Sequence, residues 1–208
     1  ASKRALSDFG LNVPDFRAVG AKDVATAASD LGFPVAIKVL STTIAHKDRV
    51  GGVRLNIDSV KAAESAVSNM VSDIASAIPG YRAEQFFVER MVQGAVAEYI
   101  IGIKRHPALG LALMIGLGGT SVEDRAAYRS VLLPPSPGDI DAVLAQLGVL
   151  PGTPQHQALT KAAQAVQSYA LAHADRLVTL DVNPVIVTAD GAAVAVDALI
   201  VLTDENEE

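Results

Sequence analysis

Leu180-Asp181-Val182-Asn183-Pro184-Val185-Ile186-Val187, followed by a turn at Asp190-Gly191 and then by Ala193-Val194-Ala195-Val196-Asp197-Ala198, is the stretch that decides the fold of this chain. Two apolar runs of β type joined by so short a turn predict a β-hairpin. A three-residue loop centred on Asp190 places Asn183 directly opposite Asp197. Asp181 then shares their face, because side chains two positions apart on a strand point the same way.

Three oxygen-bearing side chains would therefore gather on an apolar ribbon, where removing them from water without a partner is costly. Magnesium is a suitable partner, since it takes few protein oxygens and completes its octahedron with water and substrate. In a second interpretation, Asn183-Pro184 marks an irregularity and Asp197 is solvated. The hairpin alone favours this second interpretation, because a two-residue loop shifts the register by one and turns one partner to the other face.

Composition limits the class of protein. At 208 residues, half of them hydrophobic, the chain is long enough to bury a core as one domain or as two intimate subdomains. The formal net charge of -6 and the lack of a basic tract argue against nucleic acid as a partner. The absence of cysteine excludes disulfides and thiol chemistry and fits a cytoplasmic protein. With no membrane-length apolar run and no apolar signal core, we expect a soluble chain with no membrane partner.

The remaining patterns predict alternating helices and strands. We expect a short helix ending at Gly10, a helix from a cap at Asp23 to Leu31, strands over 35–40 and 53–57, and a helix from Asp58 whose buried stripe is Ala63, Val67, Met70, Val71 and Ile74. Strand-like runs at 85–92, 97–103 and 109–115 predict an antiparallel meander. Helices begin at caps at Ser136 and Thr153, and residues 204–208 form an acidic tail.

Lys38 interrupts an apolar strand, so its ammonium either reaches an anion at the sheet surface or belongs to an edge strand and extends to water. The loop over 43–52 carries His46, a potential nucleophile toward a phosphoryl group, and the pair Gly51-Gly52, whose backbone amides can approach phosphate oxygens. Polar loops are also common simply because they are solvated.

Two further constellations are candidates for nucleotide contacts. Glu89 and Met91 end a strand that reads as a hinge between lobes, where backbone groups can recognise adenine, and Glu98 on the next strand can accept from ribose hydroxyls. Glutamates on the solvent face of an antiparallel strand are also common without any ligand. The glycine-rich loop 116–119 with Arg129 downstream matches neither standard nucleotide loop but suits a phosphate.

Five segments in order along the chain resemble the ATP-grasp domain of the NDP-forming acyl-CoA synthetases, the superfamily that includes succinyl-CoA synthetase. They are Leu31-Gly32-Phe33-Pro34-Val35-Ala36-Ile37-Lys38, His46-Lys47 with Val50-Gly51-Gly52-Val53, Val88-Glu89-Arg90-Met91-Val92, Ile115-Gly116-Leu117-Gly118-Gly119, and Leu180-Asp181-Val182-Asn183-Pro184 with Asp197. The resemblance covers nearly the whole chain. It implies an α+β fold and a single ATP-grasp domain over 1–208. The two lobes of this domain, approximately 17–91 and 92–203, would hold a nucleotide between them.

The resemblance also implies roles for individual residues. Lys38 would contact the phosphates, the segment from Glu89 to Met91 the adenine, and Glu98 the ribose. Asn183 and Asp197 match magnesium ligands, and Asp181 matches an acidic residue near a phosphate relay. His46 matches a loop histidine proposed for that relay, and Arg129 matches an arginine in a Phe-Arg-Leu-type segment. The chain departs from the family at Lys47-Asp48-Arg49 and at 120–125, which bears on the surface that faces a partner.

The function implied is that of the ATP-grasp part of an ADP-forming acyl-CoA synthetase, a ligase that uses ATP/ADP and Mg²⁺. CoA-binding and ligase domains, or a subunit carrying a phosphohistidine, would be its partners in a homo- or hetero-oligomer. Without them we expect the chain to be inactive, as a β-type subunit or a piece of a fusion. Two alternatives are a nucleotide-sensing module fused to a protein acetyltransferase and an ATP-grasp carboxylate-amine ligase.

Overall fold

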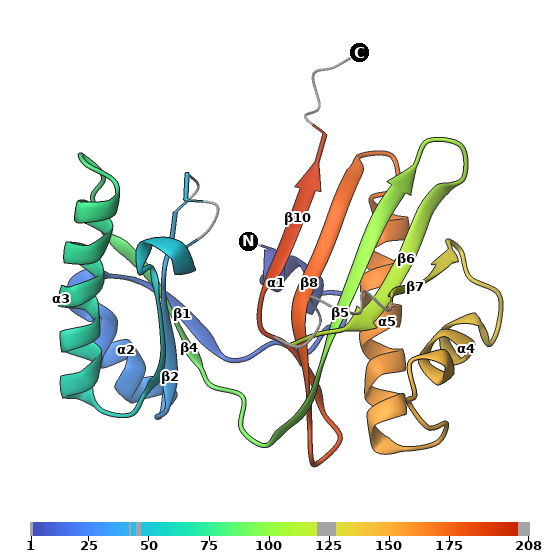
Figure 1. Cartoon of the computed structure of the whole chain (residues 1–208), viewed down its shortest axis with the longest axis horizontal. Helices are drawn as coiled ribbons and strands as arrows, with labels where there is room; N and C mark the ends of the chain where they lie inside the picture. Colours follow the sequence, from blue (N-terminus) through green and yellow to red (C-terminus); the bar gives the residue numbers. More distant parts are fainter. Residues whose placement is uncertain (1, 42, 45–46, 120–127, 204–208) are drawn as a thin grey trace. The chain divides into compact units, whose positions relative to one another are not determined.

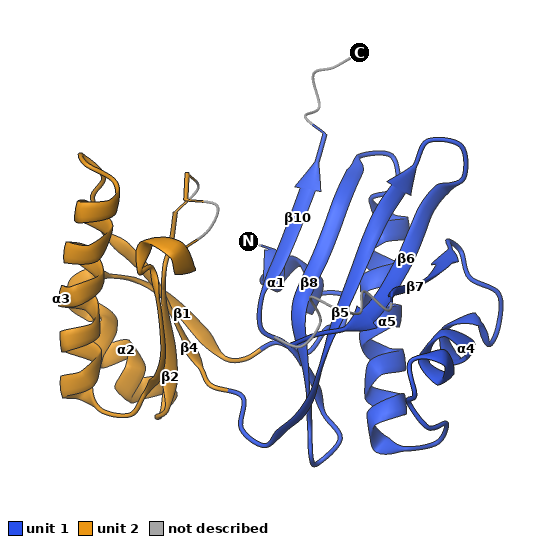
Figure 2. Ribbon diagram, viewed as in Figure 1, with its two compact units in different colours: residues 1–13, 92–208 blue, residues 14–91 orange. Residues whose placement is uncertain are grey.

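Residues 14–91 and the rest of the chain pack as two units, each around its own hydrophobic core (Figure 2). The computed structural model describes residues 2–41, 43–44, 47–119 and 128–203. Unit 2 is Pro14–Met91, and unit 1 combines Ala1–Val13 with Val92–Glu208. Unit 1 is therefore discontinuous in sequence, whereas unit 2 is one continuous segment.

Unit 2 is an antiparallel four-stranded sheet in the order β1-β4-β2-β3, with helices on one face (Figure 1). Its strands are β1 (Phe16–Gly20), β2 (Val35–Val39), β3 (Val53–Ile57) and β4 (Gln85–Arg90), and its helices are α2 (Val24–Leu31), α3 (Val60–Ala77) and the short η1 (Ala21–Asp23) and η2 (Asp48–Val50). Alternation in β2 buries Val35, Ile37 and Val39 against the helices and turns Lys38 to the opposite face.

Helix α3 begins at Val60, two residues later than predicted. Ser59, and not Asp58, is the N-cap residue, and its hydroxyl accepts a hydrogen bond from Ala62 N at 3.3 Å. Four members of the predicted stripe are buried, whereas Val71 is 38% exposed. Val71 adjoins Met70 in sequence, and the two side chains point about 100° apart around the helix, so only one of them faces the sheet.

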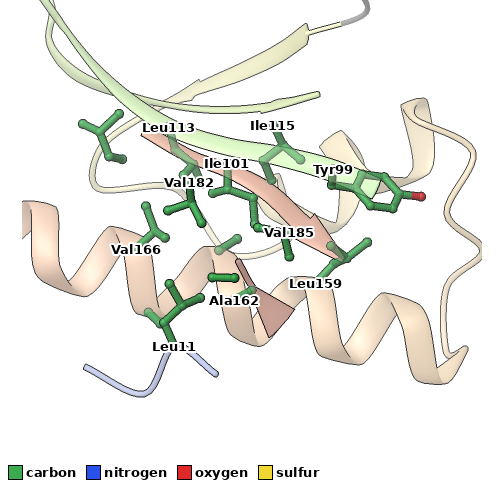
Figure 3. Close-up of a cluster of buried hydrophobic side chains, with 14 of the residues drawn as sticks. Leu11, Tyr99, Ile101, Leu113, Ile115, Leu159, Ala162, Val166, Val182 and Val185 are labelled. Carbon is green, nitrogen blue, oxygen red and sulfur yellow. The ribbon is translucent and has the colours of Figure 1, made fainter. Parts of the chain in front are cut away.

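Unit 1 is built on one antiparallel sheet in the order β10-β8-β5-β6-β7, with β9 also paired to β8. Its strands are β5 (Ala95–His106), β6 (Gly110–Leu117), β7 (Tyr128–Leu132), β8 (Leu177–Thr188), β9 (Ala193–Ala195) and β10 (Ala198–Leu202), and its helices are α1 (Ser2–Ser7), α4 (Asp139–Gln146) and α5 (Pro154–Ala172). Figure 3 shows the aliphatic core, in which Ile101, Ile115 and Val182 of the sheet pack against Leu159 and Val166 of α5.

Several predicted elements need correction. The meander is wrong in part: β5 and β6 pair as expected, but β4 lies in the sheet of unit 2. Strands β1 and β7 were not predicted. Within the described part of the chain, the Asp23 side chain makes no cap hydrogen bond to α2. Helix α4 starts at Asp139, after Gly138 as N-cap; the Asp139 carboxylate instead accepts from Ser136 N at 2.7 Å.

The register of the C-terminal hairpin is confirmed. Val185 pairs with Ala195 and Val187 with Ala193, which is the register of a three-residue loop centred on Asp190. The predicted irregularity at Asn183-Pro184 is also present: the peptide bond is cis, and β8 carries one more residue than β5 between the pairs Tyr99–Val185 and Ile101–Val182. The register required by the first interpretation and the irregularity named in the second are therefore both present.

Among the described residues, no helix is long and apolar enough to cross a membrane.

Candidate functional site

Asp181 lies on the face of the unit 1 sheet turned away from α5, which we call the distal face. It is directly opposite Leu199 on β10 and Gly102 on β5, and Gly102 is opposite Met114 on β6. The residues that precede and follow these positions on the strands, such as Val182, are buried on the other face and point to α5. Gly102 allows a close backbone approach: a Cβ at position 102 would lie only 3.1 Å from Leu180 O, and 3.6 Å from Asp181 Oδ1.

Asn183 and Asp197 are held together by the main chain of the hairpin. Asn183 N donates to Asp197 O at 3.1 Å, and Val196 N donates to Pro184 O at 3.0 Å. The Asp197 carboxylate accepts from Ala198 N at 2.9 Å, and the side chains of Asn183 and Asp197 are exposed. Asn183 and Asp197, two of the candidate ligands, are thus directly opposite each other in the hairpin.

The charges of Asp181 and Asp197 act on each other. Burial raises the pKa of Asp181 above its ordinary value, and the nearby Asp197 carboxylate raises it further. A divalent cation between these groups would relieve both effects, since it favours the ionised carboxylates.

A cavity of about 450 Å³ opens on the distal face. Asp181 and Asn183 line it together with Gly102, Met114 and Tyr128. The Tyr128 ring lies against Gly116, where an added Cβ would come within 2.6 Å of Tyr128 Cδ1. The lining combines apolar side chains with the carboxylate of Asp181, the carboxamide of Asn183 and the basic Lys104 and Arg105, and such a mixture is typical of ligand sites.

Sequence reasoning did not single out Tyr128 or Gly102, although both help to form this cavity. Tyr128 follows a segment without strand signals, so β7 and its faces were not assigned. The available signal for Gly102 was a glycine inside an apolar strand, which marks a close approach.

The register places Arg129 on the opposite face of the sheet from Asp181. It pairs with Ile115, which is buried toward α5, whereas Tyr128 pairs with Gly116 on the distal face. The Arg129 guanidinium donates to Tyr128 O at 3.0 Å. The structure therefore does not bring Arg129 together with the acidic group of the hairpin.

In unit 2, Lys38 and Glu89 form an ion pair across neighbouring strands. Lys38 Nζ lies 2.5 Å from Glu89 Oε1, and the exposed fractions of the two side chains are 16% and 1%. β2 is flanked by β4 and β3, so the edge-strand interpretation of Lys38 is wrong. The backbone N–H groups of Arg90 and Met91 donate to Asp15 O and Pro34 O, both at 3.0 Å. An adenine recognised by the main chain near Met91 would therefore have to bind other backbone groups or replace these two hydrogen bonds.

The glycine pair packs tightly against β2. A Cβ at Gly52 would lie 2.7 Å from Val39 Cγ1, and Gly51 has a positive φ of 71°. Arg54 fastens this turn, because its guanidinium donates to Gly51 O at 2.8 Å and lies 2.5 Å from Asp73 Oδ2 of α3. His46, the candidate nucleophile of this loop, lies outside the described residues.

Glu98 of β5 has an exposed side chain beside the glycine-rich loop. Gly118 N donates to Glu98 O at 2.7 Å, and a Cβ at Gly118 would lie 3.1 Å from Glu98 Cβ. Gly116 and Gly118 thus serve close packing in unit 1, which is the simpler explanation of the glycine-rich sequence there.

The donor set of the hairpin fits a hard cation. Across the described ranges, no group of three His, Cys, Asp or Glu side chains could hold a metal ion. The hairpin site differs because Asn183 provides the third side chain, so Asp181, Asn183 and Asp197 together offer only oxygen ligands. Oxygen donors with room left for water and substrate suit Mg²⁺.

Comparison with known proteins gave consistent matches. A family model described as the ATP-grasp domain matches residues 1–202. Acetate--CoA ligase (ADP-forming) I of Archaeoglobus fulgidus is 36% identical over 119 residues, which are 57% of this chain and 17% of that protein. Acetate--CoA ligase (ADP-forming) II subunit beta of Pyrococcus furiosus is 28% identical over 97% of this chain and 89% of that subunit.

Solved structures with the same fold were also found. Acetyl-coenzyme A synthetase 1 of Candidatus Korarchaeum cryptofilum, in complex with coenzyme A, Ca-AMPCP and HgCl+, has a TM-score of 0.88 and 26% identity, covering 97% of this chain and 91% of that chain. The chain spans less than two thirds of the length of several of the ligases that it matches, and only 17% of the Archaeoglobus fulgidus protein.

Proposed function

The chain belongs to the ATP-grasp domain family, and on that basis we propose that it is the nucleotide-binding part of an ADP-forming acyl-CoA synthetase. The complete enzyme would convert an acid, CoA and ATP into acyl-CoA, ADP and phosphate. The observation that carries the proposal is the hairpin register that aligns the oxygen-bearing side chains of Asp181, Asn183 and Asp197, two of which line a ligand-sized cavity. Its relatives include separate β subunits, which supports a role as one part of a larger enzyme.

We propose that Asn183 and Asp197 hold Mg²⁺, with Asp181 beside them. The ion would supply charge neutralisation at phosphate oxygens. Binding of Ca-AMPCP by the Korarchaeum synthetase supports a nucleotide bound with a divalent cation. Lys38 would contribute a second positive charge at the phosphates, and the amides of Gly51 and Gly52 would approach them. These groups position the phosphates and stabilise their charge, which is what phosphoryl transfer requires of a protein.

The other roles concern the nucleoside and the phosphoryl acceptor. The main chain near Met91 would contact adenine, and Glu98 would accept from the ribose. His46 would take part in a relay that ends on a phosphohistidine of the CoA-binding and ligase partner, in the cytoplasm. Arg129 is left out of this proposal, because the register turns it to the face that α5 covers.

The test is reconstitution with a partner that carries the CoA-binding and ligase domains. Radiolabel from the γ-phosphate of ATP should appear on the partner's histidine only when this chain and Mg²⁺ are present, and addition of CoA and an acid should then form acyl-CoA. Binding of ADP by this chain alone, measured by calorimetry with and without Mg²⁺, tests the nucleotide site separately. No binding of ADP or ATP under either condition would refute the proposal.

A further inference from the structure

Glu89 is a buried carboxylate, and its burial differs sharply from that of Lys38, its ion-pair partner. The Glu89 side chain is 1% exposed, whereas the Lys38 side chain keeps 16% of its surface accessible. A ligand arriving from solvent therefore meets the ammonium and not the carboxylate. Glu89 is in the segment that resembles an adenine-binding hinge, yet its carboxylate is bound to Lys38.

The strand register explains how Glu89 is enclosed. Glu89 on β4 is directly opposite Phe16 on β1 and Ala36 on β2. The ring centroids of Phe16 and Phe87 are 5.3 Å apart beside it. Lys38 is directly opposite Phe87, so its long side chain extends diagonally past the small Ala36 to reach Glu89. A carboxylate among apolar groups requires a charge partner, and here the ammonium supplies it.

We propose that Glu89 is a positioning residue that acts on the phosphates of the nucleotide through Lys38 and does not read the base. This inference rests on the proposed function, because it assumes that Lys38 contacts phosphate. Glu89 Oε1 fixes the end of a flexible four-carbon side chain at one point, so the ammonium is already oriented before a nucleotide arrives. Such orientation lowers the entropic cost of binding for phosphate-bearing ligands alone.

The proposal separates two ligands that differ only in their phosphates. Glu89→Gln should weaken binding of Mg-ADP about tenfold, whereas binding of adenosine should change by less than about twofold. A residue that contacts adenine would weaken both ligands equally, and a loss of folded protein would do the same. Glu64→Gln on α3 is the matched control, since it removes an exposed carboxylate of the same unit.

A double substitution tests whether Glu89 acts only through Lys38. In Lys38→Met, binding of Mg-ADP should weaken while binding of adenosine stays nearly unchanged, and adding Glu89→Gln should weaken Mg-ADP no further. The double variant also removes both charges, so it does not leave an unpaired buried charge if Glu89→Gln alone folds poorly. Additive losses in the double variant would overturn the proposal.

A readout without nucleotide distinguishes this inference from the proposed function. Side-chain ¹⁵N spectra of the lysine-labelled chain should show a protected ammonium signal for Lys38, identified by its loss in Lys38→Met. The signal should disappear in Glu89→Gln and persist in Glu64→Gln; its persistence in Glu89→Gln would overturn the inference. If the wild-type chain bound neither ADP nor adenosine, the proposed function would fail, and this spectrum would still decide the role of Glu89.

Discussion

The backbone N–H of Asn183 donates to the carbonyl oxygen of Asp197 across the C-terminal hairpin, with an N···O distance of 3.1 Å. This bond joins the two candidate metal ligands through their main chains. Their side chains can therefore be removed without cutting the connection that holds the hairpin together. Asn183 and Asp197 are also both exposed, so truncating them leaves no cavity in the core.

The first prediction concerns the metal-nucleotide site. Mg-ADP at about one hundred times its dissociation constant should stabilise the folded chain by about 2.7 kcal/mol, which raises the melting temperature by several degrees. The double variant Asn183→Ala and Asp197→Ala should lose most of that rise, because the proposed Mg²⁺ site would have lost two of its oxygen ligands. Scanning fluorimetry with and without Mg-ADP measures both values.

The control for this experiment is Asp175→Ala, which removes an exposed carboxylate of the same unit from the turn before β8. It should keep the full rise. A double variant at 183 and 197 that retained the wild-type rise would disprove the metal assignment.

The second prediction concerns pH. Burial and the Asp197 carboxylate raise the pKa of Asp181 in the folded chain above the ordinary 3.8. The folded state then binds this proton more tightly than the unfolded state, so stability is lost as the pH rises from about 3.8 through the raised pKa. Asp181→Asn should therefore melt above the wild type at pH 7, by no more than about 2–4 °C because this half-buried carboxyl is partly screened by water.

The difference should shrink as the pH falls and vanish at pH values below the ordinary pKa of aspartate. Melting curves between pH 3 and pH 8 measure it, and Mg²⁺ should reduce it at pH 7. A variant that melted below the wild type throughout this range would contradict the assignment.

The third prediction concerns Tyr128, which lines the cavity, and Gly116, which lies against its ring. Gly116→Ala would place a Cβ 2.6 Å from Tyr128 Cδ1 and 2.8 Å from Cε1, so the ring has to move. We expect a loss of about 1 kcal/mol of unfolding free energy, at the low end of the cost of overpacking, because Tyr128 is 39% exposed and its ring can shift toward solvent. Tyr128→Ala should remove most of that loss when combined with Gly116→Ala, which urea titrations of the four chains can measure. Equal losses with and without the ring would show that Tyr128 is not the obstacle.

The fourth prediction compares two helix caps. The Thr153 hydroxyl accepts from His156 N at 3.2 Å at the start of α5, so Thr153→Ala should cost about 1 kcal/mol and lower the melting temperature by about 2–4 °C. Asp23 makes no cap bond to α2 within the described residues, so Asp23→Ala should stay within about 0.5 kcal/mol of the wild type. Similar losses in the two variants would contradict this distinction.

These caps also show what a sequence can and cannot predict. Asp23 and Thr153 both stand at helix starts, yet only Thr153 has the extended conformation that turns its oxygen back toward the first turn; Asp23 is itself helical, because η1 runs directly into α2. Local patterns predict that a helix begins at such residues. They do not predict the backbone angles that decide which side chain caps it.

The same limit applies to the sheets. The register of the hairpin followed from a short turn between two apolar runs, and Asp181 lies on the expected face. By contrast, β4 was grouped with β5 and β6 because neighbours in sequence usually pair, whereas it pairs with β1 and β2. Arg129 is a candidate because a guanidinium near the glycine-rich loop suits phosphate and because it matches an arginine of the resembled family, but its direction depends on the register of β7, which has weak strand signals.

The discontinuity of unit 1 has a consequence for biosynthesis. Lys3 Nζ of α1 donates to Val196 O at 3.0 Å, across 193 positions of sequence, and Leu6 is fully buried in the core of unit 1. During translation, the residues that make these contacts are synthesised far apart in time. Residues 14–91 have all their core partners once they have emerged, so they can fold before α5 and β10, the elements that α1 packs against, have been synthesised. A nascent chain from which residues 14–91 have fully emerged should therefore present one folded module preceded by an unpacked N-terminal segment that exposes Leu6, because a helix of six residues is not stable without its packing partners.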